Sequence, residues 1–117
     1  MTIGIAIDVL GNVFTASYDR SVVMKNLPDG TAAPGPWPVS TGSNPFGITI
    51  DSSGNIYTTN FTSNTVTKIL PDGTIAPGPW PVKTGINPLG VVIDKSTSLY
   101  TTNLNSYTVT KIIIGPL

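Results

Sequence analysis

The sequence predicts an all-β protein built from three copies of one four-stranded antiparallel unit, the last copy lacking its outer strand. The first observation is a repeat of 43 residues, visible in the Gly-x-x-Ile-Asp segments that begin at Gly4, Gly47 and Gly90. The second is that Gly, Asp, Asn and Pro clusters divide each copy into short segments rich in Ile, Val, Tyr and Thr. The third is the absence of helical periodicity throughout the chain.

The repeat divides the one predicted domain, residues 1–117, into units 1–43, 44–86 and 87–117. In the second unit we expect strands at roughly 47–51, 56–60, 65–70 and 78–83. The turns between the strands contain Asp, whose side chain closes local hydrogen bonds, and Gly, which supplies positive φ. Five of the six acidic residues therefore have a turn role before any catalytic one.

The fourth segment of each unit tests the strand interpretation, because Pro34, Pro36 and Pro38 alternate with other residues. Amide groups two residues apart point to the same side of a strand, so the three missing N–H donors fall on one edge. Only an outermost strand tolerates this arrangement, and the proline edge resists pairing with other chains. We therefore expect the fourth strand to be a protected outer edge. The third unit ends at Leu117, where its outer strand would begin.

A unit of this length with four antiparallel strands is typical of one blade of a β-propeller. Residues 44–57, followed by 64–69 and 71–74, resemble an NHL-type blade, similar to those of streptogramin (virginiamycin B) lyase-like proteins. The resemblance covers all three units and implies a propeller fold. It leaves the function open, because the family includes enzymes, protein-binding modules and RNA binders on one scaffold.

Propellers close with about four to eight blades, and this chain supplies three at most. An open stack would expose the apolar faces by which blades pack, including Ile5 and Ile7 on an inner strand. Two copies supply six blades, and the resemblance to NHL-type propellers implies six as their most common number of blades. We therefore expect a homodimer that closes one six-bladed ring, with residues 112–114 covered by another chain or by a terminus. The alternative is a fragment of a longer propeller.

The composition excludes several chemistries. The chain contains no His, Cys, Glu or Gln, so it has no Ser-His-Asp or Cys-His nucleophile system, no disulfide and no zinc site of the usual type. Six Lys and Arg residues balance six acidic ones, which argues against a nucleic-acid partner. We see neither a secretory signal nor an apolar run of roughly 20 residues, so we expect no membrane partner and, by default, a cytoplasmic protein.

The resemblance implies that ligands bind the top face of the propeller, formed by two kinds of loop in each blade. One kind enters the innermost strand, and the other joins the second and third strands. The candidate ligand-binding residues lie in or beside these loops: Asn44, Asn60, Asn87, Asn103, Tyr18, Phe61 and Tyr107. Two interpretations of the Asn residues are open. They brace turns and close hairpins, or they bind a sugar, a polar metabolite or a hard cation.

Two further sets recur at the repeat period. Lys25, Lys68 and Lys111 form either a basic ring or a row of alkyl stems that pack on the strand surface. Trp37 and Trp80 are either platforms for sugar rings or packing residues of the outer strand.

From these observations we expect a non-enzymatic binding or interaction module that presents its top face to a small polar ligand or a protein partner. The alternative is a minimal metal-dependent lyase or lactonase related to streptogramin lyase. If the resemblance extended to activity, it would imply the histidine base, acidic residues and divalent metal expected of streptogramin lyase-like enzymes. This chain has neither His nor Glu to match them. We therefore expect no catalytic residue, no metal ligand and no cofactor.

Overall fold

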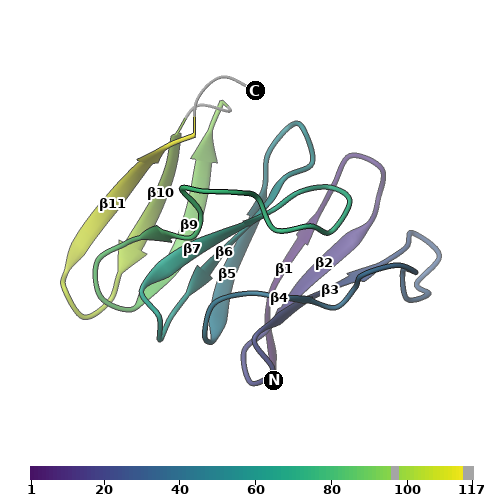
Figure 1. The fold of residues 1–117 in the computed structure, drawn as a ribbon, viewed down its shortest axis with the longest axis horizontal. Helices are drawn as coiled ribbons and strands as arrows, with labels where there is room; N and C mark the ends of the chain where they lie inside the picture. Colours follow the sequence, from purple (N-terminus) through teal and green to yellow (C-terminus); the bar gives the residue numbers. More distant parts are fainter. Residues whose placement is uncertain (96–97, 115–117) are drawn as a thin grey trace.

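The computed structural model describes residues 1–95 and 98–114, which form eleven strands in three antiparallel sheets (Figure 1). Blade 1 contains β1 (Thr2–Ile7), β2 (Val13–Ser17), β3 (Val22–Asn26) and β4 (Val39–Ser40). Blade 2 contains β5 (Pro45–Ile50), β6 (Ile56–Asn60), β7 (Thr65–Ile69) and β8 (Val82–Lys83). Blade 3 contains β9 (Pro88–Asp94), β10 (Ser98–Asn103) and β11 (Thr108–Ile113). The predicted all-β fold of three repeated sheets is confirmed.

Each sheet pairs its strands in chain order, from an innermost strand outwards. The innermost strands β1, β5 and β9 contact one another in sequence, and the three sheets stand side by side (Figure 1). Blade 3 has three strands in the described part of the chain, which agrees with the expected loss of its outer strand. Residues 115–117, where that strand would begin, lie outside the described residues.

The outer strand is shorter than the sequence predicts. Of residues 78–83 in blade 2, only Val82 and Lys83 pair with β7, so the predicted strand is wrong at residues 78–81. In the equivalent segment of blade 1, Gly35 has a φ of +92°, which turns the chain away from the sheet. The prolines on either side have no N–H to donate to a ladder. A proline-rich bend followed by a two-residue strand therefore forms the outer edge.

Two apolar clusters hold the blades together at equivalent positions. The face that a blade turns to the next blade, here called its leading face, is formed in blade 1 by Phe14, Val23 and Val39 and in blade 2 by Tyr57 and Val66. The opposite face, here called the trailing face, is formed in blade 2 by Ile48, Ile50, Ile56 and Ile69 and in blade 3 by Val91, Ile93, Leu99 and Ile112. Each interface packs a leading face against a trailing face, and this burial is the main source of cohesion between blades.

Glycines allow the innermost strands of neighbouring blades to approach closely. A Cβ atom added at Gly4 would meet the carbonyl oxygen of Phe46, and one at Gly47 would meet the carbonyl oxygen of Leu89, both closer than 3.0 Å. The hydroxyl of Thr59 also donates a hydrogen bond of 2.7 Å to the Leu89 carbonyl. A side chain at either glycine would push one blade away from the next.

Replacing Gly47 with alanine tests this close approach. The added methyl group would meet backbone, which cannot move aside, so we expect Gly47→Ala to lower the free energy of unfolding by about 1–3 kcal/mol. The matched control is Gly78→Ala, because no atom lies within 4 Å of the Cβ position of Gly78. Urea denaturation should find the control unchanged or up to about 1 kcal/mol more stable. Equal midpoints for the two variants would contradict the packing argument.

Candidate functional site

The loops that carry the candidate residues lie together at one end of the blades, the lower end in Figure 1, where the N-terminus lies. The N–H of Phe61 donates to the carbonyl oxygen of Asn44 at 2.9 Å, and the N–H of Leu104 donates to that of Asn87 at 2.9 Å. These bonds join the loop before each innermost strand to the hairpin after the second strand. We call this end the top face, and it consists of loops 18–21, 41–44, 61–64, 84–87 and 104–107.

Asn60 and Asn103 are buried, and their amides bond within their own hairpins. The amide nitrogen of Asn60 donates to the hydroxyls of Thr65 at 3.0 Å and Thr67 at 2.8 Å. Its side-chain oxygen accepts a hydrogen bond of 3.0 Å from the hydroxyl of Thr58. Asn103 makes the equivalent bonds one repeat later, with Thr108, Thr110 and Thr101. These are the contacts expected if Asn60 and Asn103 close their hairpins.

Asn44 and Asn87 connect one blade to the preceding one. Both have positive φ, 60° and 58°, a conformation that Asn tolerates better than most residues. The amide nitrogen of Asn44 donates to the carbonyl oxygen of Tyr18 at 2.9 Å, and that of Asn87 donates to the carbonyl oxygen of Phe61 at 2.9 Å. These are the contacts expected if Asn44 and Asn87 brace their turns. Ligand binding by the four Asn residues stays a prediction.

Aromatic rings gather on the top face where blades 1 and 2 meet. The rings of Tyr18 and Phe61 lie 6.3 Å apart between centroids, with their planes tilted by 55°. The ring of Phe46, on β5, lies 6.5 Å from that of Phe61. All three side chains are half-buried. We call these residues the aromatic cluster.

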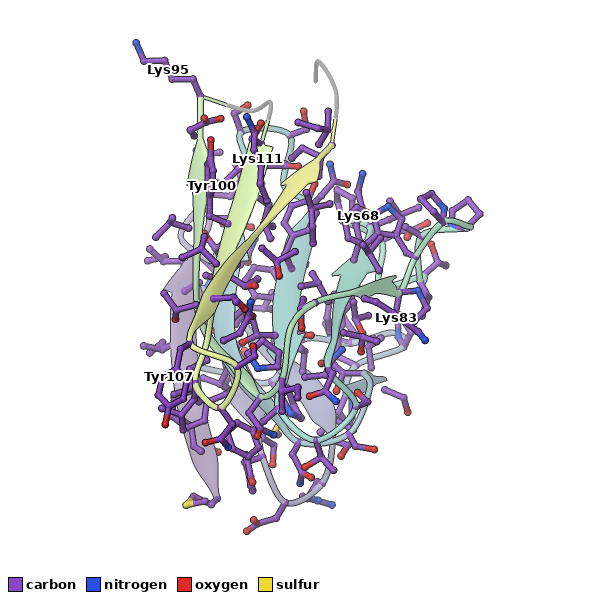
Figure 2. All side chains as sticks on the ribbon, turned by 90° about the vertical axis from the view of Figure 1, so that its left-hand side faces the viewer. Lys68, Lys83, Lys95, Tyr100, Tyr107 and Lys111 are labelled. Atoms are coloured by element: carbon purple, nitrogen blue, oxygen red, sulfur yellow. The ribbon has the colours of Figure 1, made fainter. Side chains whose placement is uncertain are left out.

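Tyr107 does not join the aromatic cluster. It lies in the β10–β11 hairpin, is almost fully exposed and adopts a φ of 56° (Figure 2). The structure therefore unites two of the three predicted aromatic residues and separates the third.

Sequence reasoning missed Phe46, although a signal was present. Ile3, Phe46 and Leu89 occupy one repeat position, directly before the glycine of the inner strand, and the residue differs in every copy. The same three side chains line a shallow groove of about 290 Å³ along the innermost strands. Since Phe46 lines the groove and its ring also lies beside that of Phe61, the aromatic cluster borders this groove.

The turn carboxylates are engaged by the turns that contain them, as the sequence predicts. Asp51 is buried and accepts hydrogen bonds from the N–H groups of Ser53 and Asn55 at 2.9 and 3.0 Å and from the hydroxyl of Tyr57 at 2.8 Å. Burial of the phenol and this hydrogen bond raise the pKa of Tyr57 far above its usual value. A carboxylate held in this way is a structural acceptor rather than a general acid or base.

The recurring Lys and Trp residues pack on one another. The ammonium nitrogen of Lys25 lies 5.7 Å from the ring centroid of Phe14 and 5.6 Å from that of Trp37. Lys68 makes the same contacts with Tyr57 and Trp80 in blade 2. These distances are in the range of cation–π attraction, so the packing interpretation accounts for both sets.

Within residues 1–95 and 98–114, no three acidic side chains come together in a group that could hold a metal ion. In the same residues, no helix has the length and apolar character needed to cross a membrane.

No protein-family model matches the sequence, and a search of curated proteins found no match. Solved structures do match. A streptogramin B lyase structure is 23% identical with a TM-score of 0.61, and the match covers 99% of this chain and 40% of that one. The virginiamycin B lyase of Staphylococcus aureus is 19% identical with a TM-score of 0.62, covering 97% of this chain and 41% of that one. The chain has the fold of a β-propeller segment.

Hydrazine synthase from Kuenenia stuttgartiensis matches with a TM-score of 0.72 at 14% identity, covering 98% of this chain and 36% of that one. The propeller segment therefore spans about two fifths of the length of the solved structures it matches. The expected likeness to streptogramin lyase-like propellers is confirmed at the level of the fold. Matches at this low identity carry no information about activity or ligand.

The structural role of Asn60 can be measured directly. Replacing Asn60 with alanine removes three hydrogen bonds, two of them buried, and leaves the buried hydroxyl of Thr58 without its acceptor, so we expect a loss of about 2–4 kcal/mol in the free energy of unfolding. The matched control is Asn26→Ala, which removes one solvent-accessible bond of 3.2 Å to the Gly30 carbonyl. Denaturation of the control should show a change below about 1 kcal/mol. A similar loss in both variants would contradict the structural role of Asn60.

Acid should weaken the propeller segment through its turn carboxylates. Hydrogen bonds from the side chains and backbone of Thr31 and Thr74 hold the pKa values of Asp29 and Asp72 below the usual value of 3.8. Because the folded pKa is below the unfolded one, this stabilisation is present above about pH 4 and is lost as the pH falls through the folded pKa. Melting temperatures measured from pH 7 to pH 2 should drop below pH 4, and less so in the double variant Asp29→Asn, Asp72→Asn. An identical drop in the double variant would contradict this role for the two carboxylates.

Proposed function

We propose that the chain is a non-enzymatic binding module whose top face takes a small polar ligand or a loop of a protein partner. The observation that carries this proposal is the aromatic cluster of Tyr18, Phe61 and Phe46, which joins two blades beside the groove. Partly exposed aromatic rings stack on the faces of sugars and other flat polar molecules.

The fold itself does not require aromatic residues at these positions. Leu104 occupies the repeat position of Tyr18 and Phe61, and Leu89 occupies that of Phe46. Blade 3 therefore forms its hairpin and inner strand with aliphatic side chains at both places. Three aromatic rings gathered where blades 1 and 2 meet are more easily explained by a ligand than by packing.

Polar groups beside the aromatic cluster could orient such a ligand. The hydroxyl of Tyr18 makes no hydrogen bond to any described residue, and the side chain of Arg20 is exposed. The carboxylate of Asp19 lies 2.7 Å from the terminal amine of Met1, and both groups are accessible to solvent. An exposed ion pair of this kind contributes little to stability, so it can rearrange when a ligand binds.

The alternative function is a metal-dependent lyase, suggested by the fold that this chain shares with a streptogramin B lyase. The engagement of the turn carboxylates favours binding over catalysis, because each has protein donors on its oxygen atoms. Metal analysis after dialysis separates the two functions. Calcium or magnesium retained at one equivalent per chain would favour the lyase.

A panel of mono- and oligosaccharides, screened by thermal shift and on a glycan array, tests the binding proposal. We expect a ligand whose affinity falls at least about tenfold in Phe61→Ala and Tyr18→Ala, because each change removes a stacking surface worth about 1.4 kcal/mol. The matched control is Ile75→Ala, which truncates a partly exposed apolar side chain away from the top face. Equal affinity in all three variants, or no binding by the unchanged chain, would count against a sugar-binding top face.

A further inference from the structure

The two end blades expose faces that are covered in the middle of the stack. On the trailing face of blade 1, Ile5 is 70% exposed, whereas its repeat equivalent Ile48 packs into the cluster between blades 1 and 2. On the leading face of blade 3, Val109 is 65% exposed, whereas its equivalent Val66 is fully buried. Figure 2 shows this leading face towards the viewer, with Tyr100 and Lys111 labelled on it.

The internal repeat indicates what fits each exposed face. Both interfaces within the chain pack a leading face against a trailing face, using the same repeat positions. The leading face of blade 3 is therefore complementary to a trailing face, and the trailing face that remains free is that of blade 1. Blade 1 lies at the opposite end of the same stack (Figure 1), so its free trailing face reaches blade 3 in a second copy.

Gly90 gives an independent indication of the same contact. Gly4 and Gly47 have to be glycine because a Cβ atom would meet a carbonyl oxygen of the next blade. Gly90 occupies their repeat position, yet a Cβ atom there would meet only the hydroxyl of Thr102, at 3.0 Å. Apart from its chain neighbours, no backbone atom of residues 1–95 and 98–114 lies within 4 Å of the Cβ position of Gly90, so a close approach of another strand within this part of the chain does not account for the glycine. A second copy would, because docking in the same way places its Ile3 carbonyl against this glycine.

The turn between β1 and β2 gives a third indication. Val9 is 93% exposed, and with Leu10 it replaces the Ser52-Ser53 pair of blade 2. Ser52 and Ser53 line a cleft of about 220 Å³ together with Val9, Leu10 and Lys25 of the preceding blade. In a docked pair, Val9 and Leu10 would occupy the equivalent cleft beside Lys111 and Tyr100. Within one chain the two side chains remain 93% and 77% exposed although they border the cleft between blades 1 and 2, and docking would cover the apolar surface that this cleft leaves open.

We propose that the leading face of blade 3 in one copy docks onto the trailing face of blade 1 in a second copy. The same contact formed in both directions closes a ring of six blades by a twofold axis along the groove. Six is the multiple of three blades that falls within the roughly four to eight blades of closed propellers. Closure converts the groove into a channel and brings a second aromatic cluster to the top face. This assembly goes beyond the proposed function, and its test measures mass rather than ligand binding.

Light scattering on the purified chain after size exclusion tests the docking. We expect a mass of about twice 12.2 kDa. Gly90→Ala should raise the dimer dissociation constant at least about tenfold, because its methyl group would meet the Ile3 carbonyl of the second copy. An unchanged circular dichroism spectrum would show that the variant still folds. The matched control Gly78→Ala should remain as dimeric as the unchanged chain, since no atom lies within 4 Å of its added methyl group.

A second pair of variants tests the same contact in case Gly90→Ala changes the dimer dissociation constant only slightly. Val109→Asp places a charge in the middle of the proposed contact and should abolish the dimer. The matched control Ile86→Asp changes an exposed apolar residue outside both end faces and should leave the dimer intact. A monomer at all concentrations, or Gly90→Ala and Val109→Asp variants as dimeric as their controls, would overturn the proposal. A mass above that of two copies would also overturn it, because the ring closes at two.

Discussion

The close contact between the innermost strands of neighbouring blades is the constraint on which the other features of this molecule depend. Gly4 and Gly47 place the backbone of one blade against a carbonyl oxygen of the next. This short separation at the inner strands brings the leading and trailing faces together further out, where Phe14, Val23 and Ile56 become buried. A side chain at the glycine position would separate those apolar faces and weaken every contact between the two blades.

The same stacking assembles the top face. Because successive blades keep one register, Asn44 reaches the carbonyl oxygen of Tyr18 in the preceding blade, and Asn87 reaches that of Phe61. These bonds fix the hairpins of neighbouring blades beside one another. The aromatic cluster results from this placement, since Tyr18 and Phe61 belong to different blades and lie 43 residues apart in the sequence. The scaffold is thus repetitive, and the side chains it displays on its top face are not.

Much of the fold could be predicted from the sequence, because its signals are local and are written three times. The run of Ile, Tyr and Thr that follows the turn at residues 51–55 located β6 to the residue, at Ile56–Asn60. The prediction of the outer strand failed because the missing N–H groups of its prolines restrict where a strand can pair but do not force the segment to be extended. Phe46 was missed for a different reason. Its contact with Phe61 depends on how two strands of one blade place their ends, which no short-range pattern encodes.

On its two end blades the chain exposes a leading face and a trailing face, and we propose that these are the two halves of the interface that it already uses twice internally. A crystal structure of the purified chain tests this most directly, by showing what lies against Gly90. We predict the Ile3 carbonyl oxygen of a second copy against the Cβ position of Gly90, as the Phe46 carbonyl oxygen lies against that of Gly4 and the Leu89 carbonyl oxygen against that of Gly47. Gly90 facing solvent, or packed against any other surface, would contradict it.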